Sequence, residues 1–240
     1  MTKSSPHLVK RAFTLIELLV VIATIFVIAG AAVPAFHSAF ERARATKDLN
    51  NLRQIGVATQ IYMNDNNGAL FSTTGSWMSQ LYNADNPAAS KYISSWNVFV
   101  SPFDHPVSPR TALSKSATSA VSYGINGTAG VVGMSADKIS NPTAFIVFAP
   151  AQASGTTVTF QGVGNTTSQV NLAGSSNVTV LATNSPGGPA AGGTQTNRTK
   201  INSLFADWHV ETMYWSATGP AFINMAPTGT DPDGAYRWSP

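Results

Sequence analysis

The sequence predicts an α+β fold: one long N-terminal helix, transmembrane in its first half and amphipathic in its second, packed on a small, mainly antiparallel β-sheet. Three observations predict it: an apolar run at 13–36, a helical spacing of apolar residues that continues beyond it, and later short segments rich in β-branched residues. We therefore expect a leader at 1–12, a transmembrane helix at 13–36, an amphipathic helix at 37–64 that continues into the domain, and a β-rich domain at 65–240.

The apolar run is long enough to cross a membrane. It reads FTLIELLVVIATIFVIAGAAVPAF and is apolar apart from Thr14, Glu17 and Thr24. As an α-helix it spans about 36 Å, whereas a bilayer core is about 30 Å thick. A helix in the core of a soluble domain rarely stays apolar on every face for this length. The run is therefore predicted to be a transmembrane helix.

Basic residues stand before this run. Lys3, Lys10 and Arg11 precede it, which predicts a cytoplasmic N-terminus and a C-terminal domain on the opposite side of the membrane. Of the 14 basic residues, the other 11 balance the 11 acidic ones, so no nucleic-acid-binding face is predicted. A secretory signal cleaved near 29–31 is the alternative. Its apolar segment would normally be only about 7–15 residues long.

Glu17 is the anomaly in this run. An acidic side chain within a membrane span costs roughly 2.5–3.5 kcal/mol, so it needs a partner or a proton. The segment 13–36 holds no Lys, Arg or His that could pair with it. A cut just before Phe13 would free an α-amine, which a neighbouring subunit could supply to the Glu17 carboxylate.

The segment 10–17, KRAFTLIE, resembles the class III signal of type IV pilins and type II secretion pseudopilins. That signal is a basic leader, a small residue (normally Gly), and Phe-Thr-Leu-Ile-Glu opening the hydrophobic helix. The resemblance implies that a membrane prepilin peptidase cuts between Ala12 and Phe13 and methylates the new amine of Phe13. It makes Glu17 the docking carboxylate and assigns Pro34 to assembly, because the family has a proline at a comparable place. Ala12 stands where the family normally has glycine.

The helix is predicted to continue to about Met63. Apolar or small residues recur mostly three or four apart, and polar residues fill the other faces. The apolar face is Phe36, Phe40, Ala43, Leu49, Leu52, Ile55, Thr59 and Tyr62, and the polar residues are Glu41, Arg42, Arg44, Lys47, Asp48 and Arg53. The segment 64–68, NDNNG, should end the helix, because Asn and Gly tolerate the left-handed cap conformation. Pro34 is expected to kink or loosen it.

After residue 69 short segments alternate with Gly- and Asn-rich turns, which predicts strands. Strands are predicted at 97–100, 144–148, 156–160, 170–172 and 178–181, with a hairpin formed by 201–206 and 209–215. A short helix is predicted near 76–83. The segment 184–197, with two Pro and four Gly, is predicted to be a flexible connection.

Two further segments resemble a large bacterial group of pseudopilin-like proteins: SYGIN at 122–126 and FADWHVE at 205–211. In that group the second usually reads Phe-Ala-Asp-Gly-His-Val, so Trp208 stands where glycine is usual. The related pattern also often has a His upstream of the Asp, which this chain lacks.

No set of residues predicts catalysis. Asp207, His209 and Glu211 alternate, so on a strand they would share one face as a metal or acid–base site, but a structural His beside a turn is the simpler interpretation. Asp231 and Asp233 are calcium-ligand candidates in a turn that lacks the other EF-hand ligands. The absence of cysteine excludes disulfides, a thiolate nucleophile and Cys-based metal sites. We expect no cofactor, with calcium at that turn as the alternative.

The resemblance implies a pilin-like fold and a non-enzymatic function. The chain would be a single-pass prepilin of the bacterial inner membrane, with a periplasmic domain, that is cleaved, methylated and assembled into a type II secretion pseudopilus or a type IV pilus-like filament. Its partners would be further copies or other pilins, the prepilin peptidase, the inner-membrane assembly machinery and membrane lipid. The alternative is a binding module for glycan or secretion cargo on a pilin-type anchor, using the five tryptophans, although tryptophans in a small β-layer are expected in the core.

Overall fold

The structure is a computed structural model of the chain. It describes residues 14–73, 75–83, 92–103, 121–126, 131–153, 159–163, 169–171, 195, 200–216 and 221–223. The chain divides into two compact units, Met1–Arg42 and Ala43–Pro240.

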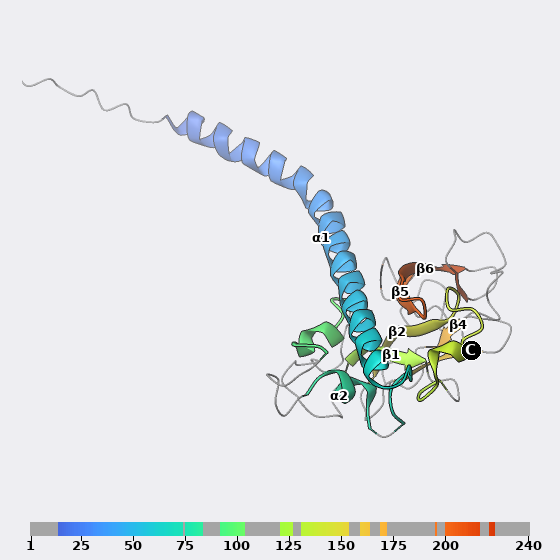
Figure 1. Ribbon diagram of the computed structural model, residues 1–240. Helices are drawn as coiled ribbons and strands as arrows, with labels where there is room; N and C mark the ends of the chain where they lie inside the picture. Colours follow the sequence, from blue (N-terminus) through green and yellow to red (C-terminus); the bar gives the residue numbers. More distant parts are fainter. Residues whose placement is uncertain are drawn as a thin grey trace, which may run out of the picture. The chain divides into compact units, whose positions relative to one another are not determined.

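One helix, α1, runs from Leu15 to Asp65 and belongs to both units (Figure 1). Its 51 residues confirm the predicted single long helix. The helical backbone continues through Pro34 without an interruption in its assignment, and the side chain of Pro34 lies outside the described residues.

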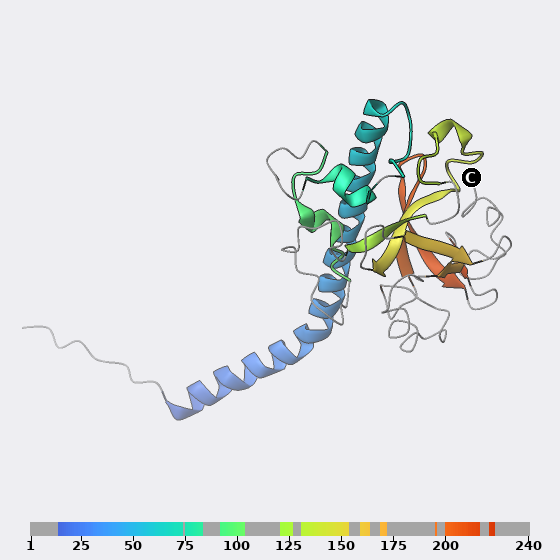
Figure 2. The same ribbon diagram turned by 90° about the horizontal axis from the view of Figure 1, so that it is seen from below.

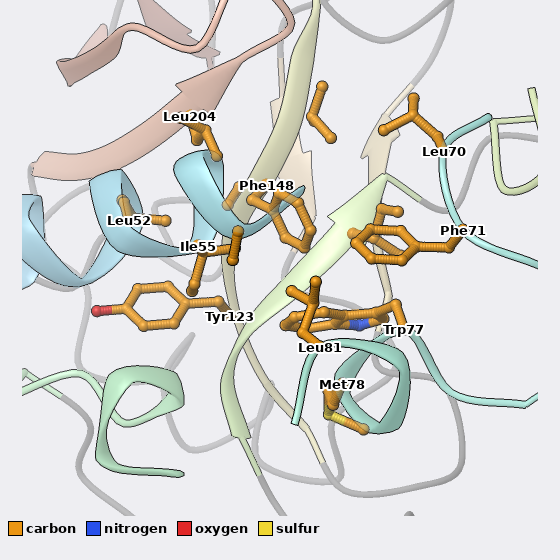
Figure 3. Close-up of a cluster of buried hydrophobic side chains, with 14 of the residues drawn as sticks. Leu52, Ile55, Leu70, Phe71, Trp77, Met78, Leu81, Tyr123, Phe148 and Leu204 are labelled. Atoms are coloured by element: carbon orange, nitrogen blue, oxygen red, sulfur yellow. The ribbon is translucent and has the colours of Figure 1, made fainter. Parts of the chain in front are cut away.

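Within the second unit α1 is amphipathic, as predicted. Leu52 and Ile55 are fully buried and face Tyr123, Phe148 and Leu204 of the sheet (Figure 3). The same face of the helix buries Ala58, Thr59, Tyr62 and Met63. This 3.6-residue period packs one side of the helix against the domain and leaves the other side in solvent.

The end of α1 also matches the prediction. Asn67 and Gly68 have positive φ angles of 55° and 76°, and the amide of Gly68 donates a hydrogen bond of 2.8 Å to the carbonyl of Met63. This left-handed turn satisfies a carbonyl that the helix end leaves unpaired. The helix α2, Trp77–Leu81, follows within the predicted range and is capped by Ser76, whose hydroxyl accepts a hydrogen bond from the amide of Ser79.

The predicted strand at 97–100 is wrong. Residues Trp96–Phe99 form a 3₁₀-helix, η2, which begins at the capping residue Ser95. Trp96 and Phe99 are three residues apart and therefore lie on one side of the 3₁₀ turn, where their rings pack edge to face at 5.0 Å. The apolar run thus reflects burial of one side of a turn. A second 3₁₀-helix, η3, covers Ala136–Lys138.

Seven strands of the described residues form one sheet in the order β4-β3-β1-β2-β5-β6-β7. Figure 2 shows strands of this sheet, coloured yellow to orange, beside the C-terminal half of α1. Their bounds are β1 Val121–Asn126, β2 Ile146–Ala153, β3 Thr159–Val163, β4 Gln169–Asn171, β5 Lys200–Phe205, β6 Val210–Ser216 and β7 Ala221–Ile223. The central strands β1, β2, β5 and β6 are antiparallel neighbours, whereas β1 and β3 are parallel. The chain is therefore α+β, with a mainly antiparallel sheet.

The strand predictions succeed where the sequence pattern is local. The hairpin of β5 and β6 is confirmed, and the predicted segments at 144–148 and 170–172 overlap β2 and β4. The segment at 156–160 overlaps only the start of β3, and β1 was not predicted as a strand. The predicted strand at 178–181 lies outside the described residues, as does the predicted connection at 184–197 apart from Gln195.

An aromatic cluster fills the core between α2 and the sheet. The Trp77 ring lies 4.8 Å from Phe148 and 5.4 Å from Phe99, both in edge-to-face geometry (Figure 3 shows Trp77 and Phe148). Phe71 adds a third partner of Trp77 at 6.1 Å. Trp77 and Trp96 are 1% and 4% exposed, which confirms these two as core residues.

Candidate functional site

The first unit exposes a long apolar helix. The large apolar side chains from Leu15 to Ile28 are 48–80% exposed, and the stretch Leu15–Ala32 has a mean hydropathy of 2.6. Apolar surface left in water costs about 25 cal/mol per Å², so a helix of this kind requires an apolar environment. The stretch is long and apolar enough to cross a membrane, as predicted.

Glu17 closes a capping box with Thr14. The amide and hydroxyl of Thr14 donate hydrogen bonds of 2.9 and 2.8 Å to Glu17 Oε2, and the Glu17 amide donates one of 3.2 Å to Thr14 Oγ1. This reciprocal arrangement satisfies donors that a helix start leaves unpaired. This capping box was not predicted, although Thr-x-x-Glu before an apolar run is its sequence signature. Both donors reach Oε2, so among the described residues Oε1 keeps its capacity for another donor.

The other predicted site residues cannot be placed in the same way. Ala12 and Phe13, which flank the predicted cleavage point, lie outside the described residues. Asp231 and Asp233, the calcium candidates, also lie outside them.

Asp48 is a buried carboxylate that the sequence analysis placed on the polar side of the helix, and this assignment is wrong. Its side chain is 1% exposed. Asp48 precedes Leu52 by four residues and Ile55 by seven, so the helical period itself places all three on the buried face. The spacing therefore indicates that Asp48 is buried, although its charge suggests an exposed position.

Three uncharged donors from different parts of the domain surround this carboxylate. The Tyr123 hydroxyl of β1 donates a hydrogen bond of 2.6 Å to Oδ1, and the Asn202 amide of β5 donates one of 2.7 Å to Oδ2. The Ser101 hydroxyl donates a short hydrogen bond to Oδ1. Asp48 thus joins α1 to two central strands and to the segment after η2.

A second layer orients two of these donors. The amide of Phe103 donates to Ser101 Oγ at 3.2 Å, and the Thr212 hydroxyl donates to Asn202 Oδ1 at 2.7 Å. Because these acceptor atoms are already occupied, the Ser101 proton and the Asn202 amide group point to Asp48. The network therefore specifies one arrangement of helix and sheet.

Burial dominates the electrostatics of this network. Loss of water raises the pKa of Asp48, and the hydrogen bonds from Ser101, Tyr123 and Asn202 oppose the rise. Burial and the neighbouring carboxylate also raise the pKa of Tyr123 well above its usual value. A buried group without solvent contact has no route to a substrate, so the network is structural rather than catalytic.

The predicted cluster of Asp207, His209 and Glu211 does come together at the turn between β5 and β6. His209 Nδ1 contacts Asp207 Oδ1, and His209 Nε2 lies 3.6 Å from Glu211 Oε2. The imidazole stacks on the Phe205 ring at 4.3 Å. Among the described residues no group of three His, Asp or Glu side chains could hold a metal ion. The geometry favours the structural interpretation of His209, because its imidazole contacts Asp207 and Glu211 and stacks on Phe205.

Trp208 lies in the same turn and has a φ angle of 72°. That left-handed conformation is uncommon for a bulky residue, whereas glycine adopts it without strain. The pseudopilin-like group that the segment 205–211 resembles usually has glycine at this position. The conformation brings the indole against α1: a Cβ built on Gly56 would lie 3.7 Å from Trp208 Cε3. Packing of the indole on the core offsets the backbone strain of about 1–2 kcal/mol.

Comparisons with protein-family models, with curated proteins and with solved structures found no match to this chain.

Proposed function

We propose that this protein is a structural subunit of a type II secretion pseudopilus or a type IV pilus-like filament. It is made as a membrane-inserted prepilin, cleaved between Ala12 and Phe13, methylated on the Phe13 amine, and assembled through its apolar helix. The observation that carries the proposal is the coincidence of the KRAFTLIE signal with an apolar helix whose side chains are exposed from Leu15 onward.

The apolar helix explains both states of such a subunit. Before assembly its side chains lie in lipid, and after assembly they lie against neighbouring helices. In either state the exposed surface of Leu15–Ala32 is removed from water. We place the N-terminus in the cytoplasm and the C-terminal domain in the periplasm, because basic residues precede the helix.

Glu17 supplies the specificity of docking. Its carboxylate sits in the first turn of the helix, where Thr14 already donates to Oε2. The methylated amine of a neighbouring subunit would take the other oxygen. That contact would neutralise a charge within the membrane and fix the axial position of one subunit against the next.

A binding module for glycan or cargo receives no support from the tryptophans. Trp77 and Trp96 are core residues, and Trp208 packs on the core beside α1. The side chains of Trp215 and Trp238 lie outside the described residues. We therefore retain assembly as the proposed function.

Mass spectrometry of the N-terminus tests the proposal directly. The full-length chain is expressed in a bacterium that has a prepilin peptidase, and the membrane-associated protein is purified. We expect a mature chain that begins with N-methylated Phe13. The matched control replaces Ala12 by Asp, which should block the cut. A chain that keeps Met1, or that begins near Ala32 after signal-peptidase cleavage, would overturn the proposal.

A further inference from the structure

The helix α1 carries a patch of two aromatic and two basic side chains where the predicted membrane span ends. Phe36, Phe40, Arg44 and Lys47 follow one another at steps of four, four and three residues, so they share one face of the helix. The two phenylalanines are 60% and 65% exposed, and Arg44 and Lys47 are exposed as well. We call these four residues the aromatic–basic patch.

The helix around this patch has a net positive charge. Between the end of the predicted span at residue 36 and Asp48, it holds three basic residues, Arg42, Arg44 and Lys47, and one acidic residue, Glu41. The next acid is Asp48, which is 1% exposed and is bound by donors of the domain. Its charge therefore lies inside the second unit, and the outer surface of the helix stays basic.

Helix geometry sets how far these side chains lie from the apolar core of the membrane. Because α1 is one continuous helix, each residue after Phe36 adds about 1.5 Å along its axis. Phe40 is then about 6 Å and Arg44 about 12 Å beyond the core, whereas the headgroup region is about 5–7 Å thick on each side. Phe40 therefore lies at the depth of the headgroups, and the backbone of Arg44 lies just outside them.

The direction of the side chains closes the remaining distance. In an α-helix each Cα–Cβ bond leans towards the N-terminus, which for α1 is the side of the membrane. Long basic side chains near the end of a membrane helix extend along apolar surface and place their charged groups at the interface. Phe40 precedes Arg44 by one turn on the same face, so its ring supplies that apolar surface.

We propose that the aromatic–basic patch binds anionic phospholipid headgroups in the membrane leaflet on the side of the domain. The Phe40 ring lies among the headgroups, and Arg44 and Lys47 pair with the phosphates of negatively charged lipids. A zwitterionic lipid binds less well, because its own ammonium group competes for its phosphate. The inference rests on the proposed function in one respect, namely that the segment 13–36 spans a membrane.

The position of the patch selects lipid as its occupant. Headgroups surround the helix at this depth from the moment the chain is inserted, whereas a protein partner would have to displace them. Apolar rings beside basic residues on one helix face are the composition that binds anionic membrane surfaces. The bound patch also acts as a stop, because further inward movement of the helix would carry the Arg44 charge into the apolar core.

Native mass spectrometry tests the lipid preference. The full-length chain is purified in detergent and mixed with equal amounts of dioleoyl phosphatidylglycerol and dioleoyl phosphatidylcholine, and the retained lipids are counted. We expect several-fold more phosphatidylglycerol than phosphatidylcholine, and no preference in the double variant Arg44→Gln, Lys47→Gln. The matched control is Arg53→Gln, an exposed position of α1 about 26 Å beyond Phe36, which should keep the preference.

Spin labelling tests the depth independently, because the chain has no cysteine of its own. Ala39→Cys and Val57→Cys, two exposed positions of α1, are labelled in the full-length chain and reconstituted in vesicles. With one part phosphatidylglycerol to three parts phosphatidylcholine, the label at 39 should be shielded from a neutral, water-soluble nickel chelate and the label at 57 should not. Pure phosphatidylcholine, or the double variant, should raise the accessibility at 39 several-fold.

Several results would overturn the inference: equal retention of the two lipids, an unchanged preference in the double variant, or a loss of preference in Arg53→Gln, which would indicate a general effect of charge. A double variant that keeps its lipid preference but no longer forms filaments would show that the patch contacts protein instead.

Failure of this inference can be told apart from failure of the proposed function. If the unsubstituted chain is found in the membrane with a methylated Phe13 but retains both lipids equally, only the inference fails. If the chain keeps its leader and does not enter the membrane, the proposed function fails as well.

Discussion

At the scale of single residues, Glu17 combines two roles that can be separated chemically. It completes a capping box with Thr14, and in the proposed filament it binds the amine of a neighbour. Glu17→Gln keeps the capping box, since Gln serves at that position, but removes the charge. Thr14→Ala keeps the charge and removes the Thr14 hydroxyl, at a cost of about 0.5–2 kcal/mol to the helix start.

We therefore expect Glu17→Gln to insert in the membrane but to abolish assembly, and Thr14→Ala to assemble. Filament yield by electron microscopy, with membrane fractionation for the monomer, measures both. Normal filaments from Glu17→Gln would show that capping, rather than charge, is the function of this residue.

We expect the buried Asp48 to make the free energy of unfolding depend on pH in an unusual way. Its pKa is raised in the folded domain because burial disfavours the charged form. The folded state therefore holds the proton more tightly than the unfolded chain, and the contribution of Asp48 to the free energy of unfolding increases as pH falls from the folded pKa towards the ordinary value of 3.8. Asp48→Asn should remove this contribution and leave stability at pH 7 equal to or above that of the unsubstituted protein.

The new amide can be accommodated by a flip of Asn202, whose oxygen then accepts while the Thr212 hydroxyl accepts from its nitrogen. No such rearrangement compensates for Asp48→Ala, because this change leaves a cavity and buried donors without an acceptor. It should destabilise the domain by about 3 kcal/mol or more. Thermal unfolding from pH 4 to pH 8 measures both variants. A greater loss at pH 7 from Asp48→Asn than from Asp48→Ala would contradict this account.

At the scale of elements, α1 approaches the sheet closely because Gly56 lacks a side chain. A Cβ there would lie 3.1 and 3.3 Å from the two methyl carbons of Leu204, a buried residue of β5. Gly56→Ala gains about 1 kcal/mol of helix propensity and loses part of it to this contact, so it should be nearly neutral.

Gly56→Val adds a Cβ and two methyl groups where the core has no room, and should lower the free energy of unfolding by about 1–3 kcal/mol. Gln54→Val, on the exposed side of the same helix, is the control and should change it by less than about 0.5 kcal/mol. Thermal unfolding of the detergent-solubilised chain provides the comparison. Equal effects at the two positions would show that α1 is not packed closely at Gly56.

The elements that the sequence predicts well are those whose signal is local. The α1 period, its Asn-Gly end and the β5–β6 hairpin each follow from neighbouring residues. The sheet order does not, because β1 pairs in parallel with β3 and β2 pairs with β5 across a long stretch of chain. In the candidate site, the Thr-x-x-Glu spacing could have predicted the Thr14–Glu17 capping box. The helical period could have predicted the burial of Asp48. The hydrogen-bond partners of Asp48 could not be predicted, since they come from segments distant in the sequence.

At the scale of the whole molecule, the two units differ in what they need from their surroundings. The second unit buries a core of its own, whereas the first exposes the apolar side chains of Leu15–Ala32. A chain shortened to begin at Ala43 should therefore remain in the aqueous phase of a detergent phase partition, and the full chain should enter the detergent phase.

The shortened chain also tests whether the second unit folds by itself. A fragment that begins at Ala43 keeps the core of the second unit and lacks the exposed apolar stretch, so it should be monomeric in analytical ultracentrifugation and unfold in one cooperative transition. Aggregation of the Ala43 fragment would contradict an independently folded second unit.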